Sequence, residues 1–309
     1  SLTASFGAET MTYEVGGAVL VSSPEIYVSS EADESAAAAP FATPETAAVS
    51  LEEAMKWAID GSEVFVKGTN SASINISRAV TVTGEGGRNA DRINARSGRV
   101  AVLRHPGALL RGLTLSGGAH YRGPGAYIVC GAVEDCRVSG NKVTGLGYYD
   151  CHGSVYVGDA DARVSRTVID GNEVTYNYAC GGGAYIRFGS LDNCLVVSNK
   201  AITGAGVLLV NAGAKLINCT VANNTNTCVG LVNDYGDGVY VSSDSARIVK
   251  CAVYLNFNGN DISDWKTTLK ANQTESVVLN CAFSSAEDGT FPAPSSTCVG
   301  LAAADFSDL

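Results

Sequence analysis

The chain has 309 residues and a formal net charge of −10. Because a phosphate-binding protein needs a basic face, this charge argues against nucleic acid as a partner. Attraction to other anionic polymers would require arginines or a metal ion to be concentrated locally. Apolar residues make up 46% of the chain, and glycine (35) is far more common than proline (7) or methionine (2), a mixture typical of a β-rich fold with tight turns. No run of about 18 apolar residues occurs, so no transmembrane segment is expected.

The first 47 residues are predicted to form an N-terminal extension and an irregular connector, since residues 29–47 are rich in Ala, Ser, Pro and Thr. Residues 50–59 (SLEEAMKWAI) follow as the one good helix, with Ser50 and Glu53 at the spacing of a capping box. A helix at this place would cover the open, apolar end of a solenoid. Strand-like segments at 63–69 and 79–87 would then begin the stack of strands.

One short pattern, apolar–x–x–Cys–x–apolar–x–x–Asn, recurs along the chain. Degenerate copies lie at 110–118 and 278–286, and Thr167 replaces cysteine in one of the full copies. Because the columns stay in register from copy to copy, the chain is predicted to be built of equivalent stacked units. The full copies are VEDCRVSGN (133–141), VSRTVIDGN (164–172), LDNCLVVSN (191–199), LINCTVANN (216–224) and IVKCAVYLN (248–256).

A second strand precedes each full copy. No helix-length amphipathic segment lies between the repeats, which excludes a βα barrel and a doubly wound sheet. Strands in a constant order without helical crossovers stack most simply as the coils of a parallel β-solenoid, with a rise of about 4.8 Å per coil. Period-2 alternation in these strands points Tyr127, Tyr156, Tyr185, Leu208 and Tyr240 away from the interior.

The asparagine that closes each copy is predicted to belong to a ladder. Asparagine tolerates the left-handed conformation at a tight corner. In stacked coils its amide can also bond to the amides above and below. The members are Asn141, Asn172, Asn199, Asn224 and Asn256.

Half of the ten cysteines are predicted to be buried thiols. Stacked neighbours would hold their Cβ atoms about one strand spacing apart, which is wider than the roughly 3.8 Å of a disulfide. A zinc site is not indicated, because no CxxC pair exists. Cys151 and Cys180 precede strands of consecutive coils and are candidates for a disulfide, whereas Cys130, Cys228 and Cys298 stay unassigned. The buried column consists of Cys136, Cys194, Cys219, Cys251 and Cys281.

The segment TPETAAVSLEEAMKWAIDGSEVFVKGT, followed by AVTVTGEGG, resembles the opening of pectin-lyase-like right-handed parallel β-helix proteins. CGGGAYI (180–186) with VVSN (196–199) is similar to the repeats of polymorphic outer-membrane proteins of that superfamily. We therefore expect an all-β chain with a single-stranded right-handed parallel β-helix (β-solenoid) and a short N-terminal capping helix over residues 48–290, and a tail over 291–309. The resemblance implies a secreted or cell-surface protein of bacterial origin, often one that binds or cleaves polysaccharide.

Chemistry on a solenoid requires outward side chains, because the interior is packed. Flat rings at coil spacing, fringed by Asp, His and Arg in the loops that enter the sheet, suit an extended sugar chain. Alternatively, outward tyrosines pack under a neighbouring loop or against each other as a cross-strand stack. The candidate substrate-binding residues are Tyr127, Tyr156, Tyr185, Tyr240, His120, Arg122, Tyr176 and Asp234.

Catalytic signatures are weaker. HGS (152–154) is faintly similar to the GHG of polygalacturonases, but the paired Asp and the RIK motif of that family are absent. A lyase of the calcium-dependent kind needs several carboxylates and an arginine base, which leaves Ca²⁺ open as a cofactor; Asp150, Asp159, Asp234 and Asp237 could supply the carboxylates. A metal-free lyase would use Tyr or His as base and Arg to neutralise the uronate. The candidate catalytic residues are His152, Arg187, Tyr149 and Asp150, and no metal ligands are assigned.

Two functions therefore compete. One is an extracellular β-helix protein, expected to be a monomer, that binds polysaccharide or another glycan in a groove on one outer sheet and could also cleave it. The other is a non-catalytic structural β-helix, a surface adhesin or passenger stalk. Clustering of ionisable groups beside the tyrosines favours the first, and the sequence leaves open whether the protein is an enzyme.

Overall fold

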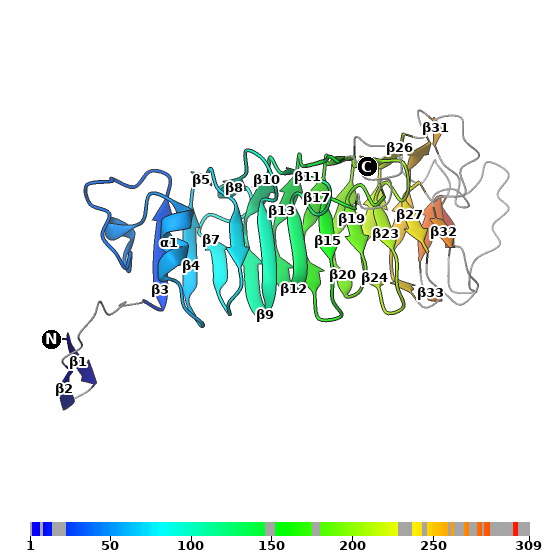
Figure 1. Ribbon diagram of the computed structural model, residues 1–309. Helices are drawn as coiled ribbons and strands as arrows, with labels where there is room; N and C mark the ends of the chain where they lie inside the picture. Colours follow the sequence, from blue (N-terminus) through cyan, green and yellow to red (C-terminus); the bar gives the residue numbers. More distant parts are fainter. Residues whose placement is uncertain are drawn as a thin grey trace.

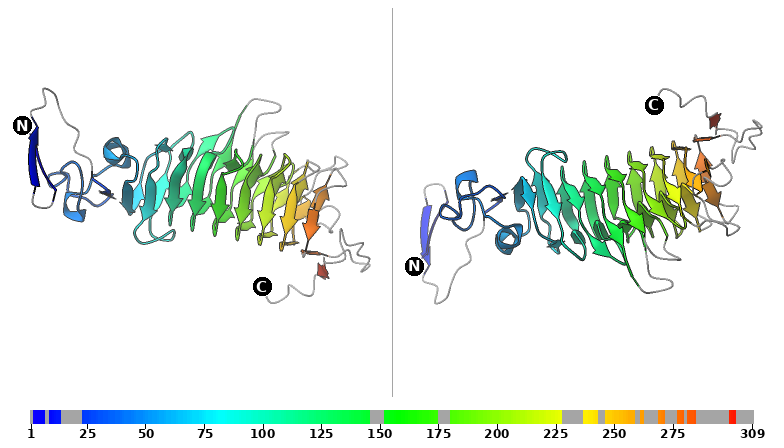
Figure 2. Two further views of the ribbon diagram at one scale, coloured as in Figure 1. Left: turned by 90° about the horizontal axis from the view of Figure 1, so that it is seen from below. Right: turned by 90° about the horizontal axis from the view of Figure 1, so that it is seen from above.

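The computed structural model describes residues 2–6, 9–13, 23–145, 152–174, 180–227, 237–242, 246–258, 261–262, 269–271, 277–279, 281–284 and 299–301. Its strands stack along one axis into a parallel β-solenoid (Figures 1 and 2). Apart from the hairpin of β1 (Leu2–Phe6) and β2 (Glu9–Tyr13), all the strands belong to three sheets. The predicted parallel β-helix is confirmed.

The largest sheet has 16 strands. Two of them, β9 and β12, are long, whereas each later coil contributes two shorter strands in their place, as β15 and β16 both pair with β12. Its strands are β3 (Glu25–Ser29), β4 (Glu63–Lys67), β6 (Ile74–Ile76), β7 (Thr81–Gly84), β9 (Ala101–Arg111), β12 (Ala126–Glu134), β15 (Val155–Val157), β16 (Arg163–Ser165), β19 (Ala184–Ile186), β20 (Ser190–Asp192), β23 (Val207–Leu209), β24 (Lys215–Ile217), β27 (Val239–Val241), β28 (Arg247–Val249), β32 (Leu269–Ala271) and β33 (Val277–Leu279).

Two smaller sheets complete each coil. The ten-stranded sheet contains β5 (Thr69–Asn70), β8 (Arg92–Asn94), β10 (Thr114–Ser116), β13 (Arg137–Ser139), β17 (Val168–Asp170), β21 (Leu195–Val197), β25 (Thr220–Ala222), β29 (Ala252–Tyr254), β34 (Ala282–Ser284) and β35 (Val299–Leu301). The seven-stranded sheet contains β11 (Ala119–His120), β14 (Lys142–Val143), β18 (Glu173–Val174), β22 (Lys200–Ala201), β26 (Thr225–Asn226), β30 (Phe257–Asn258) and β31 (Asp261–Ile262).

The register of the strands reproduces the columns read from the repeat. Val133 pairs with Val164, and the column continues through Leu191, Leu216 and Ile248. These side chains are at most 1% exposed, and together with the other inward columns they form one continuous core. Since each coil buries its apolar face only against its neighbours, the repeat and the core are one feature.

The stack begins earlier than the sequence indicated. β3 lies inside the segment assigned to the N-terminal extension, and it pairs in parallel with β4. Its outer edge is covered by the following loop, because the Tyr27 N–H donates to the Phe41 carbonyl at 2.8 Å and the Ala48 N–H donates to the Tyr27 carbonyl at 2.8 Å. The predicted boundary at residue 48 therefore falls after the first strand of the solenoid.

The capping helix is α1 (Leu51–Trp57), shorter than predicted, and it lies beside β3 and β4 at the blue end of Figure 1. The Ser50 hydroxyl accepts the Glu53 N–H at 3.2 Å, as the capping-box spacing predicts. Leu51 and Ala54 are buried in the core, while a one-turn 3₁₀ helix, η1 (Pro44–Thr46), precedes α1 in the covering loop. Helix and loop together close this end of the solenoid.

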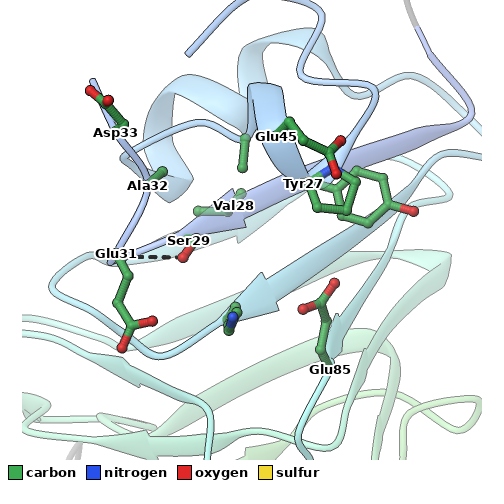
Figure 3. A pocket seen from close by; sticks show the side chains of 11 residues that line it. Tyr27, Val28, Ser29, Glu31, Ala32, Asp33, Glu45 and Glu85 are labelled. Atoms are coloured by element: carbon green, nitrogen blue, oxygen red, sulfur yellow. Dashed lines mark hydrogen bonds between the residues drawn. The ribbon is translucent and has the colours of Figure 1, made fainter. Parts of the chain in front are cut away.

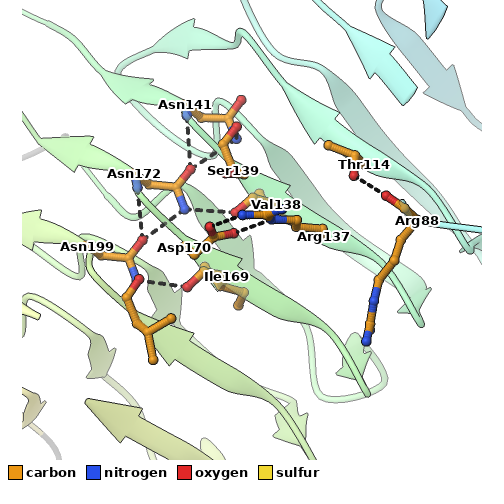
Figure 4. A network of polar contacts seen from close by, with 11 residues as sticks. Arg88, Thr114, Arg137, Val138, Ser139, Asn141, Ile169, Asp170, Asn172 and Asn199 are labelled. Carbon is orange, nitrogen blue, oxygen red and sulfur yellow. Dashed lines mark hydrogen bonds and ion pairs between the residues drawn. The ribbon is translucent and has the colours of Figure 1, made fainter. Parts of the chain in front are cut away.

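The asparagine ladder is confirmed (Figure 4). The backbone N–H and the Nδ2 of Asn172 both donate to Oδ1 of Asn199, at 3.1 and 2.9 Å. Nδ2 of Asn172 also donates to the Val138 carbonyl of the preceding coil at 2.9 Å. The same bonds join Asn141 to Asn172, Asn199 to Asn224, and Asn224 to Asn256. Each amide therefore satisfies buried groups in the coils on both sides of it.

The ladder asparagines do not themselves adopt the left-handed conformation, which corrects one part of the prediction. That conformation belongs to the residue just before each of them, because the ladder side chain has to turn inward to reach the next coil. Positive φ angles occur at Gly140 (66°), Gly171 (61°), Ser198 (56°), Asn223 (55°) and Leu255 (46°).

The cysteine column is buried, as predicted. Cys136, Cys194, Cys219 and Cys251 are free thiols inside the core, and Cys281 is buried in line with them. Their Sγ atoms face carbonyls of the preceding coil, as between Cys219 and Leu191 at 3.5 Å. Burial raises the pKa of the Cys136 thiol to about 12. Cys151, Cys228 and Cys298 lie outside the described residues, so the Cys151–Cys180 disulfide stays a prediction.

Replacing one ladder amide should destabilise the fold strongly. Asn199→Ala leaves the buried N–H and Nδ2 of Asn172 without their acceptor, and we expect a loss of about 2–4 kcal/mol in the free energy of unfolding, measured by urea denaturation. Asn89→Ala, in an exposed turn, should change it by less than about 0.5 kcal/mol. Equal effects of the two substitutions would contradict a structural role for the ladder.

Candidate functional site

The outward column of the large sheet, here called the tyrosine row, consists of Tyr127, Tyr156, Tyr185, Leu208 and Tyr240. Its members are paired in register from β12 to β27. The rings of Tyr127 and Tyr156 are 4.7 Å apart and those of Tyr156 and Tyr185 are 5.5 Å apart, with interplanar angles of 12°. The predicted outward direction is confirmed, because the row forms a cluster separate from the core.

The tyrosine row is nevertheless mostly buried, and this corrects the expectation of an open groove. Tyr156 is 4% exposed, Tyr185 9% and Tyr240 7%, while Tyr127 is half-buried. Three of the four rings therefore cannot offer a free stacking face to a sugar chain. The alternative, a cross-strand stack packed under neighbouring segments, is what the structure shows.

A second, outer layer covers the row. Arg122, His152, Cys180 and Thr203 are joined by successive parallel bridges, so the segments that enter the tyrosine strands form a ladder of their own. The His152 ring stacks on Tyr185, with centroids 3.9 Å apart and an interplanar angle of 19°. Burial, followed by the neighbouring Tyr156, raises the pKa of the Tyr185 hydroxyl to about 12. His152 is thus part of the packing around the tyrosines.

Two arginines lie over the other end of the row. The guanidinium carbon of Arg99 is 4.2 Å from the centre of the Tyr127 ring, and that of Arg122 is 5.6 Å from the centre of the Tyr156 ring. Nε of Arg99 donates to the Arg122 carbonyl at 2.9 Å, which ties the two segments together. Burial lowers the pKa of Arg99, although guanidinium stays charged at any physiological pH.

Arg99 was not predicted from the sequence. It lies upstream of the first recognisable copy of the repeat, so the pattern did not extend to it. Its position in the sequence could have indicated it, because Arg99 lies two residues before β9. Val102 of that strand pairs with Tyr127 and so extends the outward column toward the N-terminus.

Tyr121 is the exposed aromatic residue among the described residues of this region. Its side chain is 43% exposed and stacks on His120, with ring centroids 4.3 Å apart. The Arg99 and Arg122 guanidinium carbons each lie 5.9 Å from the Tyr121 ring centre. Burial, followed by repulsion from Arg99, lowers the pKa of His120. The result is an open ring flanked by two cations and an uncharged imidazole at neutral pH.

A hollow of about 330 Å³ adjoins this group. It lies where the tyrosine row would continue toward the N-terminus, because Asn75 of β6 pairs with Val102 of β9 and Val102 pairs with Tyr127. None of the described residues that line it is a carboxylate. Its lining residues are Ser73, Ile74, Asn75, Arg99, Val102, Arg104 and His120.

The predicted catalytic residues are only partly placed. His152 is half-buried against Tyr185, and Arg187 is exposed, with its guanidinium carbon 5.5 Å from the Phe188 ring centre. The remaining predicted site residues, Tyr149, Asp150, Tyr176 and Asp234, lie outside the described residues.

The carboxylates considered for Ca²⁺ do not form a described site. Asp237 is completely buried and accepts a hydrogen bond from Nδ2 of Asn226 at 2.7 Å. Asp159 is exposed and accepts the Ala160 N–H at 2.7 Å. Within the described part of the chain, no group of three His, Cys, Asp or Glu side chains could hold a metal ion.

A second hollow, of about 310 Å³, lies at the N-terminal end of the same sheet (Figure 3). Glu31, Asp33, Glu45 and Glu85 line it together with Lys67, and its floor includes Tyr27. The two hollows therefore differ in charge, one being lined by basic and the other mainly by acidic side chains.

Removing a ring from the tyrosine row should cost stability, unlike removing the exposed ring beside it. Tyr156→Ala leaves a cavity between two stacked rings, and we expect a loss of about 3–5 kcal/mol in the free energy of unfolding. Tyr121→Ala should change it by less than about 1 kcal/mol, because that side chain is largely in solvent. Chemical denaturation measures both, and equally mild effects would show that the row is open.

Comparisons with known proteins found similarity to solved structures alone. No family model and no curated protein matches the chain. Two crystal structures of pectin methylesterase from Aspergillus niger, in deglycosylated and penultimately deglycosylated form, are similar to it at 11% identity and a TM-score of 0.37, over 91% of each chain. At this distance the likeness carries no conclusion about activity. Among the described residues, no helix is long and apolar enough to cross a membrane.

Proposed function

We propose that the protein is a polysaccharide-binding β-helix whose binding surface is the exposed Tyr121 ring together with the adjacent hollow. The observation that carries this proposal is the grouping of an exposed aromatic ring, two flanking guanidinium groups and a concave surface of about 330 Å³. This surface lies at the N-terminal end of the tyrosine row, whereas the sequence predicted a groove along the row itself.

The chemistry of these groups suits a sugar chain. The apolar face of a sugar ring stacks on an exposed aromatic side chain, and its hydroxyls bond to polar groups fixed nearby. Tyr121 supplies the ring, while Asn75, Ser73 and the arginines supply donors and acceptors along the hollow. Asn75 and Arg104 lie on the neighbouring strands β6 and β9, and Arg99 is bonded to the Arg122 carbonyl, so these groups are held in place before a ligand binds.

The buried part of the tyrosine row supports the site instead of forming it. Arg99 lies against Tyr127 and Arg122 lies against Tyr156, so both cations rest on rings whose own positions are set by the stack. Cation–π contacts of this kind contribute about 0.5–2 kcal/mol each. They hold the guanidinium groups beside Tyr121 before any ligand arrives.

A structural β-helix without a ligand is the second candidate function. The burial of Tyr156, Tyr185 and Tyr240 favours it, because most of the row serves packing. A secreted or cell-surface location and a monomeric state fit either function and stay proposals. Catalysis by His152, Arg187, Tyr149 and Asp150 also stays a proposal, and ultraviolet absorbance during incubation with uronic polymers would reveal a lyase.

Loss of the exposed ring should weaken binding. With a panel of neutral and acidic oligosaccharides, isothermal titration calorimetry should show that Tyr121→Ala lowers the affinity about three- to tenfold, the loss of one ring contact. Tyr27→Ala, which removes a half-buried ring beside the acidic hollow, should leave the affinity unchanged. The reverse pattern would place the site at the other hollow, and no binding across the panel would favour the structural role.

A further inference from the structure

We propose that the hollow beside Tyr121 binds an anionic substituent of the sugar chain, a carboxylate or a sulfate ester, and that acidification strengthens this binding through His120. The inference rests on the proposed function and specifies the ligand of the same surface. It concerns three basic side chains: Arg99 just before β9, Arg104 on β9, and His120 on β11.

The first argument is the local charge. The chain carries a formal net charge of −10, yet the described residues that line the hollow include two arginines and a histidine and no carboxylate. Arg104 is exposed on β9, and Arg99 is half-buried with Nε bonded to the Arg122 carbonyl. Within the described part of the chain, the ion pairs involve Arg111, Arg137, Arg163 and Arg166, and neither arginine of the hollow takes part in one. Cationic side chains that lie close together repel each other. A bound anion offsets this repulsion, so the hollow favours an anionic ligand.

The surroundings of His120 favour its uncharged form. Its Nδ1 lies 3.2 Å from the Arg122 nitrogen, whose N–H it can accept, and 3.1 Å from the Arg122 carbonyl, to which it donates when protonated. The ring stacks on Tyr121. The charged groups around it among the described residues are cationic: Arg99 and Arg104 in the hollow, and Arg122 on its own segment. These neighbours and burial disfavour the imidazolium, so at neutral pH the ring is uncharged.

The affinity of the hollow for an anion should rise as the pH falls. Burial and the adjacent arginine lower the pKa of His120, so the ring gains its proton only as the pH falls below the ordinary range of histidine. That proton adds a third positive charge to the hollow. Carboxylates with pKa values near 4 and sulfate esters both stay ionised in this window, so the attraction between hollow and ligand increases as the pH falls.

The test compares three oligosaccharides of similar length: an oligogalacturonate for the carboxylate, a dextran sulfate for the sulfate ester, and a neutral dextran. At least one anionic ligand should bind more tightly than the neutral one, and its affinity should fall as salt is added. Arg104→Ala should weaken it about tenfold, the loss of a charged hydrogen bond. Arg247→Ala, the same change at an exposed site on β28, should leave the affinity within about twofold.

The pH arm uses the same anionic ligand at about pH 7.5 and about pH 5.0. Wild type should bind about three- to tenfold more tightly at the lower pH, whereas His120→Asn should lose most of this gain. Anionic binding that Arg104→Ala does not weaken, or tighter binding of neutral dextran, would overturn the inference while leaving polysaccharide binding intact. If the affinity of His120→Asn rises as much as that of the wild type when the pH falls, His120 is not the cause of the pH dependence. Absence of binding to all three ligands would instead contradict the proposed function.

Discussion

Every feature of this molecule depends on the register of parallel hydrogen bonds between successive coils. A residue in one coil lies directly over its equivalent in the next, so the chemistry of one position is repeated along the axis. An inward position that is apolar in one coil is therefore nearly always apolar in the next, and an inward polar group needs a partner in its own or a neighbouring coil. The asparagine ladder meets this requirement, because each amide is both donor and acceptor.

The same register explains why the tyrosine row is not a binding groove. Stacked strands bring outward rings to within 4.7–5.5 Å of each other, so their faces are used by neighbouring rings. His152 and Arg122 then cover the row from the entering segments. An outward aromatic column on a solenoid is thus a second, smaller core. Among the described residues, a free aromatic face is found where the column ends, and there Tyr121 and the basic hollow lie.

The features that could be predicted from the sequence are those that the repeat controls. The apolar columns, the buried thiols and the asparagine ladder all follow from one pattern seen several times. What covers the tyrosines could not be predicted, because Arg122, His152 and Cys180 share a position in the coil but no chemistry. Arg99 and β3 lie upstream of the readable repeat, and β3 is stabilised by pairing with β4, not by any pattern of its own. The left-handed corner was assigned one residue late, because the ladder amide has to point inward.

The tyrosine row is buried, whereas the proposed site at its end is exposed, and one measurement tests this difference directly. Hydroxyl-radical footprinting reports the solvent access of individual tyrosines with and without a bound oligosaccharide. Tyr121 should react in the free protein and be protected by the ligand, while Tyr156, Tyr185 and Tyr240 should be almost unreactive in both states. Reactive Tyr156 and Tyr185 in the free protein, protected when the oligosaccharide is added, would contradict the account and restore the groove along the row.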